Sequence, residues 1–156
     1  MKLAEALLER KSLMKKVESL KERINENAMI QEGDEPAEDA LALLAELDVA
    51  VNELESLIQR INATNNVARL ENGATLSQAI VQRDMIVLRR LSRQGLANSA
   101  GVRQNRYTRN EVKFVPTVNV ADVRRAVDDL CKAHRELDAQ IQAANWTVDF
   151  LDEVAA

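Results

Sequence analysis

Residues 36–63 read PAEDALALLAELDVAVNELESLIQRINA. Apolar side chains recur in this stretch at alternating steps of four and three residues: Ala40, Leu44, Leu47, Val51, Leu54, Ile58 and Ile61. This spacing places an apolar stripe along one side of an α-helix. Pro36 suits the first turn of a helix, and the acidic residues beside it suit the positive end of the helix dipole. We therefore predict a long helix over about 36–63.

The preceding stretch, residues 2–27, carries a matching pattern. Its stripe has one charged member, Arg10, and steps by threes and fours through Leu3, Ala6, Arg10, Leu13, Val17, Leu20 and Ile24. Such spacing is typical of a coiled-coil stripe. Because the connector that follows is short, we predict that these two helices form an antiparallel hairpin. Within the connector, the apolar run at 28–31 predicts a short strand.

Two further helices are predicted in the second half of the chain, over about 75–97 and 119–144. Thr75 can cap the first of them, and its apolar residues occupy more than one side, so several neighbours should cover it. Those residues are Leu76, Ala79, Ile80, Val81, Met85, Ile86, Val87, Leu88 and Leu91. Asn119 can cap the second, whose stripe includes a histidine: Val123, Val127, Leu130, His134, Leu137, Ile141 and Ala144. Asn72-Gly73 predicts a turn before the third helix.

A small β element is predicted beside the helices. Residues 111–115 alternate polar and apolar side chains before Pro116, and residues 146–151 resemble a final strand. Two isolated strands are marginal in water and need packing on the helices or on a second subunit. The predicted fold is therefore mainly α, with four long antiparallel helices, as a bundle or as helical hairpins, and a small accessory β element in a single domain, 1–156.

The composition agrees with a helical fold. Aromatic residues make up 3 %, charged residues 29 % and hydrophobic residues 46 % of the 156 residues, as in long helices packed by aliphatic side chains. The single Cys131 excludes an internal disulfide and favours a reducing compartment. The sequence shows no signal-peptide core and no apolar run of ~18 residues. We therefore expect cytoplasmic localisation and no membrane span.

Opposite charges lie in separate blocks of the chain. Residues 83–113 contain eight basic and two acidic residues, whereas residues 34–55 contain eight acidic residues and no Lys or Arg. Such blocks favour pairing within a subunit or between subunits. Slim helical proteins with leftover apolar positions usually self-associate. We therefore predict that the partner is a second copy, in a homo-oligomer built on a dimer.

Five ionic residues are predicted to form a buried or half-buried polar network: Arg10, Arg83, Asp84, Arg135 and Asp138. An unpaired charge inside a helical bundle costs several kcal/mol, so these side chains should pair. Arg83 or Arg10 could pair with Asp138, and Arg135 with Asp84. We interpret the network as a device that sets the alignment of helices or subunits. An anion or ligand site is the alternative.

Three loop arginines flank a tyrosine and predict a possible nucleic-acid contact: Arg103, Arg106, Tyr107 and Arg109. Arginines can neutralise phosphates, and the tyrosine ring can stack on a base. The overall acidity of the chain, with a net charge of −4, argues against this alternative.

Metal binding and catalysis have weak signals. Cys131, His134 and Asp138 share one face of the predicted fourth helix and are weak candidates for metal ligands. His134 is the one histidine of the chain, and its spacing places it in an apolar stripe. No nucleophile elbow and no phosphate-binding glycine loop are present. We therefore predict no catalytic residues, no cofactor and no enzyme activity.

Several motifs together resemble the septicolysin-like family of small bacterial proteins, over nearly the whole chain. They are MKLAEALLER at 1–10, QEGDEP at 31–36, RINATN at 60–65, GATL at 73–76, Arg83-Asp84, RELD at 135–138, Gln142 and Asn145-Trp146. The resemblance implies a largely uncharacterised protein, and the family name implies a membrane-active, pore-forming alternative. Our predicted function is a cytosolic structural or assembly protein that acts as a homo-oligomer. The other alternative is a nucleic-acid or anion binder that uses residues 83–113.

Overall fold

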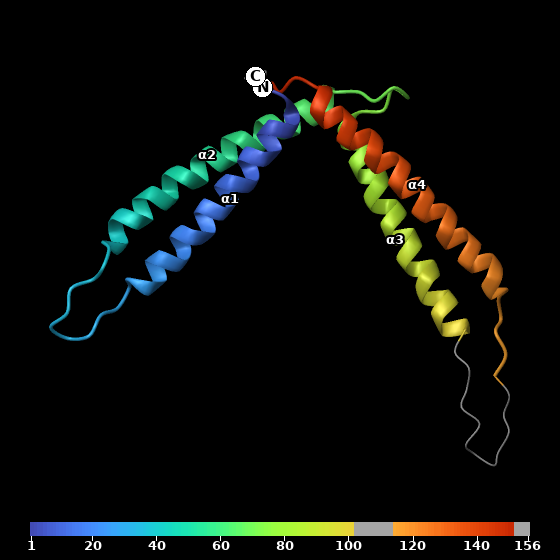
Figure 1. Cartoon of the computed structure of the whole chain (residues 1–156), viewed down its shortest axis with the longest axis horizontal. Helices are drawn as coiled ribbons and strands as arrows, with labels where there is room; N and C mark the ends of the chain where they lie inside the picture. The colour runs from blue at the N-terminus through green and yellow to red at the C-terminus, as the bar shows by residue number, and fades with distance from the viewer. Residues whose placement is uncertain (102–113, 152–156) are drawn as a thin grey trace, which may run out of the picture. The chain divides into compact units, whose positions relative to one another are not determined.

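Four long helices make up most of the chain in the computed structural model, which describes residues 1–101 and 114–151. They are α1 (Leu3–Glu26), α2 (Ala40–Val67), α3 (Leu76–Ala100) and α4 (Val120–Thr147). Figure 1 shows them as two helical hairpins, α1 with α2 and α3 with α4. The predicted fold of four long helices packed as hairpins is confirmed. The chain divides into two compact units, Met1–Thr75 with Ala143–Ala156, and Leu76–Gln142.

The first unit contains an apolar core between α1 and α2. The core joins two residues of α1 to two of α2, and three more apolar residues pack against it: Val17, Leu20, Leu43, Ala50, Ile24, Leu47 and Leu54. Burying a side chain of leucine size stabilises a fold by roughly 1.5–3 kcal/mol. Every member of the stripe predicted for residues 2–27 is buried or half-buried, so that prediction is confirmed.

The buried side of α2 differs from the predicted one. Leu44 and Val51 of the predicted stripe are 43 % and 42 % exposed, whereas Leu43, Ala50 and Leu57 are buried. The buried side also includes Leu47, Leu54 and Ile61, which belong to the predicted stripe as well. Both sets of positions follow a helical spacing, so periodicity alone does not separate them. The fully buried Ala50 lets α1 approach closely, because its side chain is small. The partner helix thus decides which apolar column turns inward.

The connector between α1 and α2 is a turn, and the strand predicted at 28–31 is wrong. Asn27 Nδ2 donates a hydrogen bond to Arg23 O at 2.9 Å, and Glu38 N donates to Asn27 Oδ1 at 2.9 Å. Gly33 has φ +94°, which L side chains rarely adopt, so the chain reverses there. Met29 is exposed and packs on no strand of the described residues, so nothing stabilises an extended segment.

Capping residues set where the helices begin. Asp39 Oδ1 accepts hydrogen bonds from Leu41 N at 2.9 Å and Ala42 N at 3.3 Å, so α2 begins four residues after the predicted Pro36. Asn119 Oδ1 accepts from Ala121 N at 3.0 Å, which confirms the predicted cap of α4. α2 and α3 also end a few residues beyond their predicted ends.

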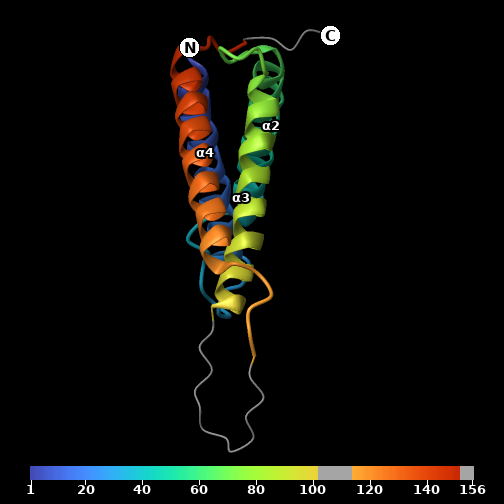
Figure 2. The ribbon, with the colours of Figure 1, turned by 90° about the vertical axis from the view of Figure 1, so that its right-hand side faces the viewer.

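The second unit consists of α3 packed along α4, as Figures 1 and 2 both show. Every member of the stripe predicted for α4 is buried or half-buried, and Val127, Leu137 and Ile141 are the most enclosed. The buried residues of α3 are Leu76, Ala79, Ile86 and Ala97. The α4 stripe is therefore confirmed.

The accessory β element is absent from the described residues. α4 continues through Trp146 to Thr147, so the strand predicted at 146–151 is wrong; the chain there forms one isolated antiparallel bridge, Lys2 with Asp149. Of the other predicted strand, residues 111–113 lie outside the described part, and residues 114–115 are exposed and irregular. The described chain after α4 runs beside the N-terminus, where Phe150 N donates to Met1 O at 3.0 Å.

Candidate functional site

A polar cluster on α3 and α4 joins three of the ionic residues singled out in the sequence. Arg83 Nη1 donates to Asp138 Oδ1 at 3.1 Å, which ties α3 to α4. Arg83 Nε and Nη2 donate to Asp84 Oδ1 at 3.2 and 3.1 Å. The helix spacing makes this possible, because Arg83 lies at the edge of the α3 surface that faces α4, and Asp138 directly follows the buried Leu137.

The charged groups of this cluster are paired with one another. Burial lowers the pKa of Arg83, but its hydrogen bonds to Asp84 and Asp138 outweigh burial, so the pKa is raised above the ordinary value. The guanidinium already faces two carboxylates, so its charge is compensated and a further anion would meet repulsion. This arrangement can fix the alignment of α3 on α4 and is poorly suited to anion binding.

The other predicted site residues lie outside this cluster. Arg135 is exposed on α4 and makes no ion pair with a described residue. Arg10 is half-buried on α1 of the first unit, and no ion pair joins it to a described residue of that unit. Cys131 and His134 are half-buried on α4, and no group of three or more His, Cys, Asp or Glu among the described residues could hold a metal ion. Arg103, Arg106, Tyr107 and Arg109 lie outside the described residues.

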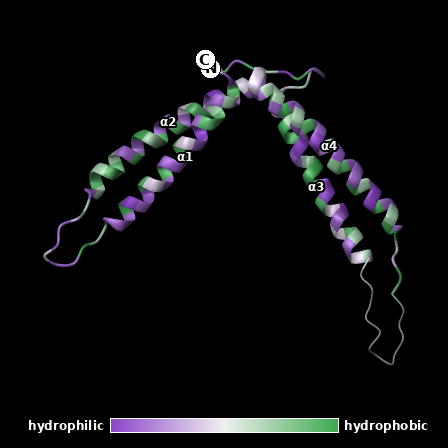
Figure 3. Ribbon diagram, viewed as in Figure 1, coloured by the Kyte–Doolittle hydropathy of each residue, from purple (hydrophilic) through white to green (hydrophobic). Residues whose placement is uncertain are grey.

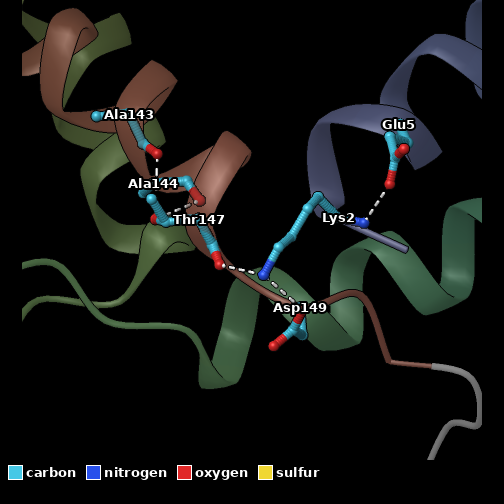
Figure 4. A network of polar contacts seen from close by, with 6 residues as sticks. All are labelled: Lys2, Glu5, Ala143, Ala144, Thr147 and Asp149. Atoms are coloured by element: carbon cyan, nitrogen blue, oxygen red, sulfur yellow. Dashed lines mark hydrogen bonds and ion pairs between the residues drawn. The ribbon is translucent and has the colours of Figure 1, made fainter.

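A second polar cluster, the terminal junction, joins the N-terminus to the chain that follows α4. Lys2 Nζ donates to Thr147 O at 2.9 Å and pairs with Asp149 Oδ1 at 2.7 Å, as Figure 4 shows. Lys2 N donates to Glu5 Oε2 at 2.6 Å, so the same residue opens α1. The hydrogen bond and charge of Lys2 lower the pKa of Asp149 below its ordinary value.

The terminal junction continues onto α2. The Thr64 side chain is fully buried; its Oγ1 donates to Arg60 O at 2.8 Å and accepts from Leu151 N at 3.2 Å. The Arg60 guanidinium lies 4.5 Å from the centre of the Phe150 ring, a cation–π distance, and Nε donates to Leu151 O at 3.2 Å. The buried ring and these polar contacts hold residues 150–151 against α2.

Sequence reasoning missed the terminal junction. Its one local signal is Thr64, which lies three residues after the buried Ile61 and continues the apolar stripe with a polar side chain. A hydroxyl at such a position needs a hydrogen-bond partner, yet spacing cannot say that the partner lies 87 residues away, at Leu151.

The first unit and the second unit each leave large apolar side chains uncovered. On α3 we define the α3 stripe as Val81, Met85, Leu88 and Leu96, which are between 43 % and 59 % exposed. Their spacing of four, three and eight residues places them on one side of the helix. Figure 3 shows hydrophobic and hydrophilic residues interspersed along α3. We predicted that several neighbouring segments would cover the apolar sides of this helix. The described residues of the second unit leave the α3 stripe uncovered.

The fold and these sites define an all-α protein of two helical hairpins, with the Arg83 cluster in the second unit and the terminal junction in the first. No described helix is long and apolar enough to cross a bilayer. The chain belongs to a family of unknown function, DUF6847, which matches residues 10–150.

One solved structure is similar over almost the whole chain. It is the crystal structure of a functionally unknown conserved protein from Corynebacterium diphtheriae, with 36 % sequence identity and a TM-score of 0.89. The similarity covers 97 % of this chain and 99 % of that one. No curated protein matches the sequence significantly.

Proposed function

We propose that this protein is a structural or assembly protein that acts as a homo-oligomer built on a dimer. The observation that carries the proposal is the α3 stripe. Four large apolar side chains on one helix face remain about half in contact with water, and covering the exposed part of each would gain roughly 1 kcal/mol. Exposed apolar patches of this kind mark interaction sites.

The polar clusters support a structural role over a chemical one. Arg83 forms ion pairs with Asp84 and Asp138, and Lys2 forms an ion pair with Asp149. Both clusters join segments that are distant in sequence. Because Arg83 and Lys2 are already paired with carboxylates, neither is well placed to bind a charged substrate. A helical hairpin with an uncovered apolar face is the kind of unit from which an oligomer is built.

Light scattering after size-exclusion chromatography tests the proposal. We expect the mass of wild-type protein to be a multiple of the 17.4 kDa chain and to fall toward 17.4 kDa on dilution. Leu88→Glu should shift the equilibrium toward the monomer. Leu8→Glu on α1 is the matched control, because Leu8 is 59 % exposed and Leu88 58 % exposed, and Leu8 lies outside the stripe. A wild-type protein that stays monomeric at high concentration would refute the proposal.

A nucleic-acid or anion binder is a second candidate, favoured by the exposed Arg89 and Arg93 on α3. If phosphates are the ligand, affinity for single-stranded RNA or DNA should fall steeply with salt. Absence of binding at low salt would rule this candidate out.

A septicolysin-like, membrane-active protein is a third candidate. Met29 and Ile30 are exposed at the turn between α1 and α2 and offer an apolar surface to a bilayer. Dye leakage from anionic liposomes tests the candidate, and Met29→Ser should reduce the leakage. Intact vesicles at micromolar protein would exclude it.

A further inference from the structure

α2 carries an exposed face that combines apolar and acidic side chains. We define the α2 stripe as Leu41, Leu44 and Val51, all exposed, with Asp48 and Glu55 exposed on the same side. The steps of three, four, three and four residues between successive members keep all five on one side of the helix. The stripe is distinct from the buried side of α2, which packs on α1.

The α3 stripe combines apolar side chains with positive charge. Arg89 and Arg93 are exposed and border the side on which Met85 and Leu96 lie. Among the described residues from Val81 to Leu96, the one acidic residue is Asp84, and it is engaged by Arg83. The two stripes are therefore alike in apolar character and opposite in charge.

The lengths of the two stripes also match. At 1.5 Å per residue, the α2 stripe from Leu41 to Glu55 is about 21 Å long, and the α3 stripe from Val81 to Leu96 is about 22 Å long. Two such faces can cover each other along their whole length.

We infer that the α3 stripe of one copy docks on the α2 stripe of a second copy, and that each copy supplies both faces, so the contact forms twice. The inference rests on the proposed self-association and assigns its surface. Apolar side chains of the two copies pack in each contact, and Arg89 and Arg93 pair with Asp48 and Glu55, which lie among the apolar members of the α2 stripe. Such charge complementarity fixes which faces pair.

The area of this interface is close to the minimum for a stable dimer. A helix face ~10 Å wide and ~22 Å long covers roughly 200–250 Å². Two reciprocal contacts bring together four such faces and bury roughly 800–1,000 Å², which is at the lower limit of about 1,000 Å² for a specific interface. A single contact would fall well below that bound, so the reciprocal arrangement is favoured.

Charge disfavours the simplest competing arrangement, in which two α3 stripes face each other. A two-fold axis near the middle of the stripe would bring the two copies of Arg89 together. Like charges placed opposite each other in an interface cost free energy. Pairing with the acidic α2 stripe turns the same arginines into attractive contacts.

Charge reversal tests the inference. One variant carries Arg89→Glu and Arg93→Glu, and the other carries Asp48→Arg and Glu55→Arg. Every one of these residues is exposed, so both variants should keep the wild-type circular dichroism spectrum and melting behaviour. Each variant alone should dimerise at least about tenfold more weakly than wild type, because like charges then meet in both contacts. An equimolar mixture should recover dimerisation as a heterodimer, since both contacts again pair opposite charges.

The outcomes separate the inference from the proposed function. If wild type dimerises and the reversals change nothing, the surface is wrong and self-association stands. If the variants weaken but their mixture does not recover, the stripes do not pair with each other and the inference is overturned. A wild-type monomer overturns both. If that monomer is destabilised by each reversal and restored by all four substitutions together, the stripes pair within one chain.

Discussion

The buried hydroxyl of Thr64 gives the sharpest stability prediction. Oγ1 donates to Arg60 O and accepts from Leu151 N, and the side chain is fully enclosed. Thr64→Val keeps the shape of the side chain and removes the hydroxyl. The Leu151 N–H then loses its acceptor, and the chain that follows α4 loses one of its contacts with α2.

The expected magnitude follows from this geometry. A buried donor left without an acceptor costs about 1–3 kcal/mol, whereas removal of both partners would cost little. Thr64→Val removes only one partner. Because the bond to Leu151 is partly buried, the lower half of that range applies, and we expect the free energy of unfolding to fall by about 1–2 kcal/mol.

Urea unfolding at fixed protein concentration measures this loss. The matched control is Thr147→Val, because the Thr147 hydroxyl also bonds a carbonyl one turn back, Ala143 O at 3.1 Å, but is exposed. The control should change stability by less than about 0.5 kcal/mol. Amide exchange at Leu151 should rise in Thr64→Val and stay low in Thr64→Ser, which keeps the hydroxyl. Equal stability losses in the two valine variants, with unchanged exchange at Leu151, would refute the reasoning.

Three further predictions concern the apolar core of the first unit and the ion pairs of Asp138 and Asp149. Leu20→Ala should cost about 2–5 kcal/mol, because Leu20 is buried in the core between α1 and α2, whereas Leu8→Ala should cost less than about 0.5 kcal/mol. Asp138→Asn should cost about 0.5–1 kcal/mol, because it breaks a half-exposed ion pair with an arginine. The lowered pKa of Asp149 stabilises the fold above the ordinary Asp pKa, and this contribution should disappear as pH falls through the lowered value. Urea unfolding measures all three.

Each of these predictions has a clear contrary result. A Leu20→Ala loss no larger than that of Leu8→Ala would contradict the assigned core. An Asp138→Asn variant more stable than wild type would show that the desolvation penalty of the Arg83–Asp138 ion pair exceeds its attraction. Equal steepness of acid unfolding in wild type and Asp149→Asn would show that Lys2 does not stabilise that carboxylate in solution.

The sequence predicts the helices and two of their buried sides well. Apolar spacing predicts the buried sides of α1 and α4, because a helix repeats every 3.6 residues and each of these helices has one dominant apolar column. Capping chemistry is local too, so Asn119 is found at the start of α4 as predicted. For the ionic residues, spacing indicates that Arg83 and Asp138 need partners, and physical chemistry requires pairing.

Only the tertiary structure decides the remaining features, because they depend on segments far apart in the chain. α2 has two apolar columns, and the close approach of α1 at Ala50 selects the one that is buried. The alternating residues after Asn145 satisfy a strand pattern, yet α4 continues to Thr147 because no strand among the described residues is available to pair with them. The partners of Thr64 and Lys2 lie at the other end of the sequence, where no local pattern reaches.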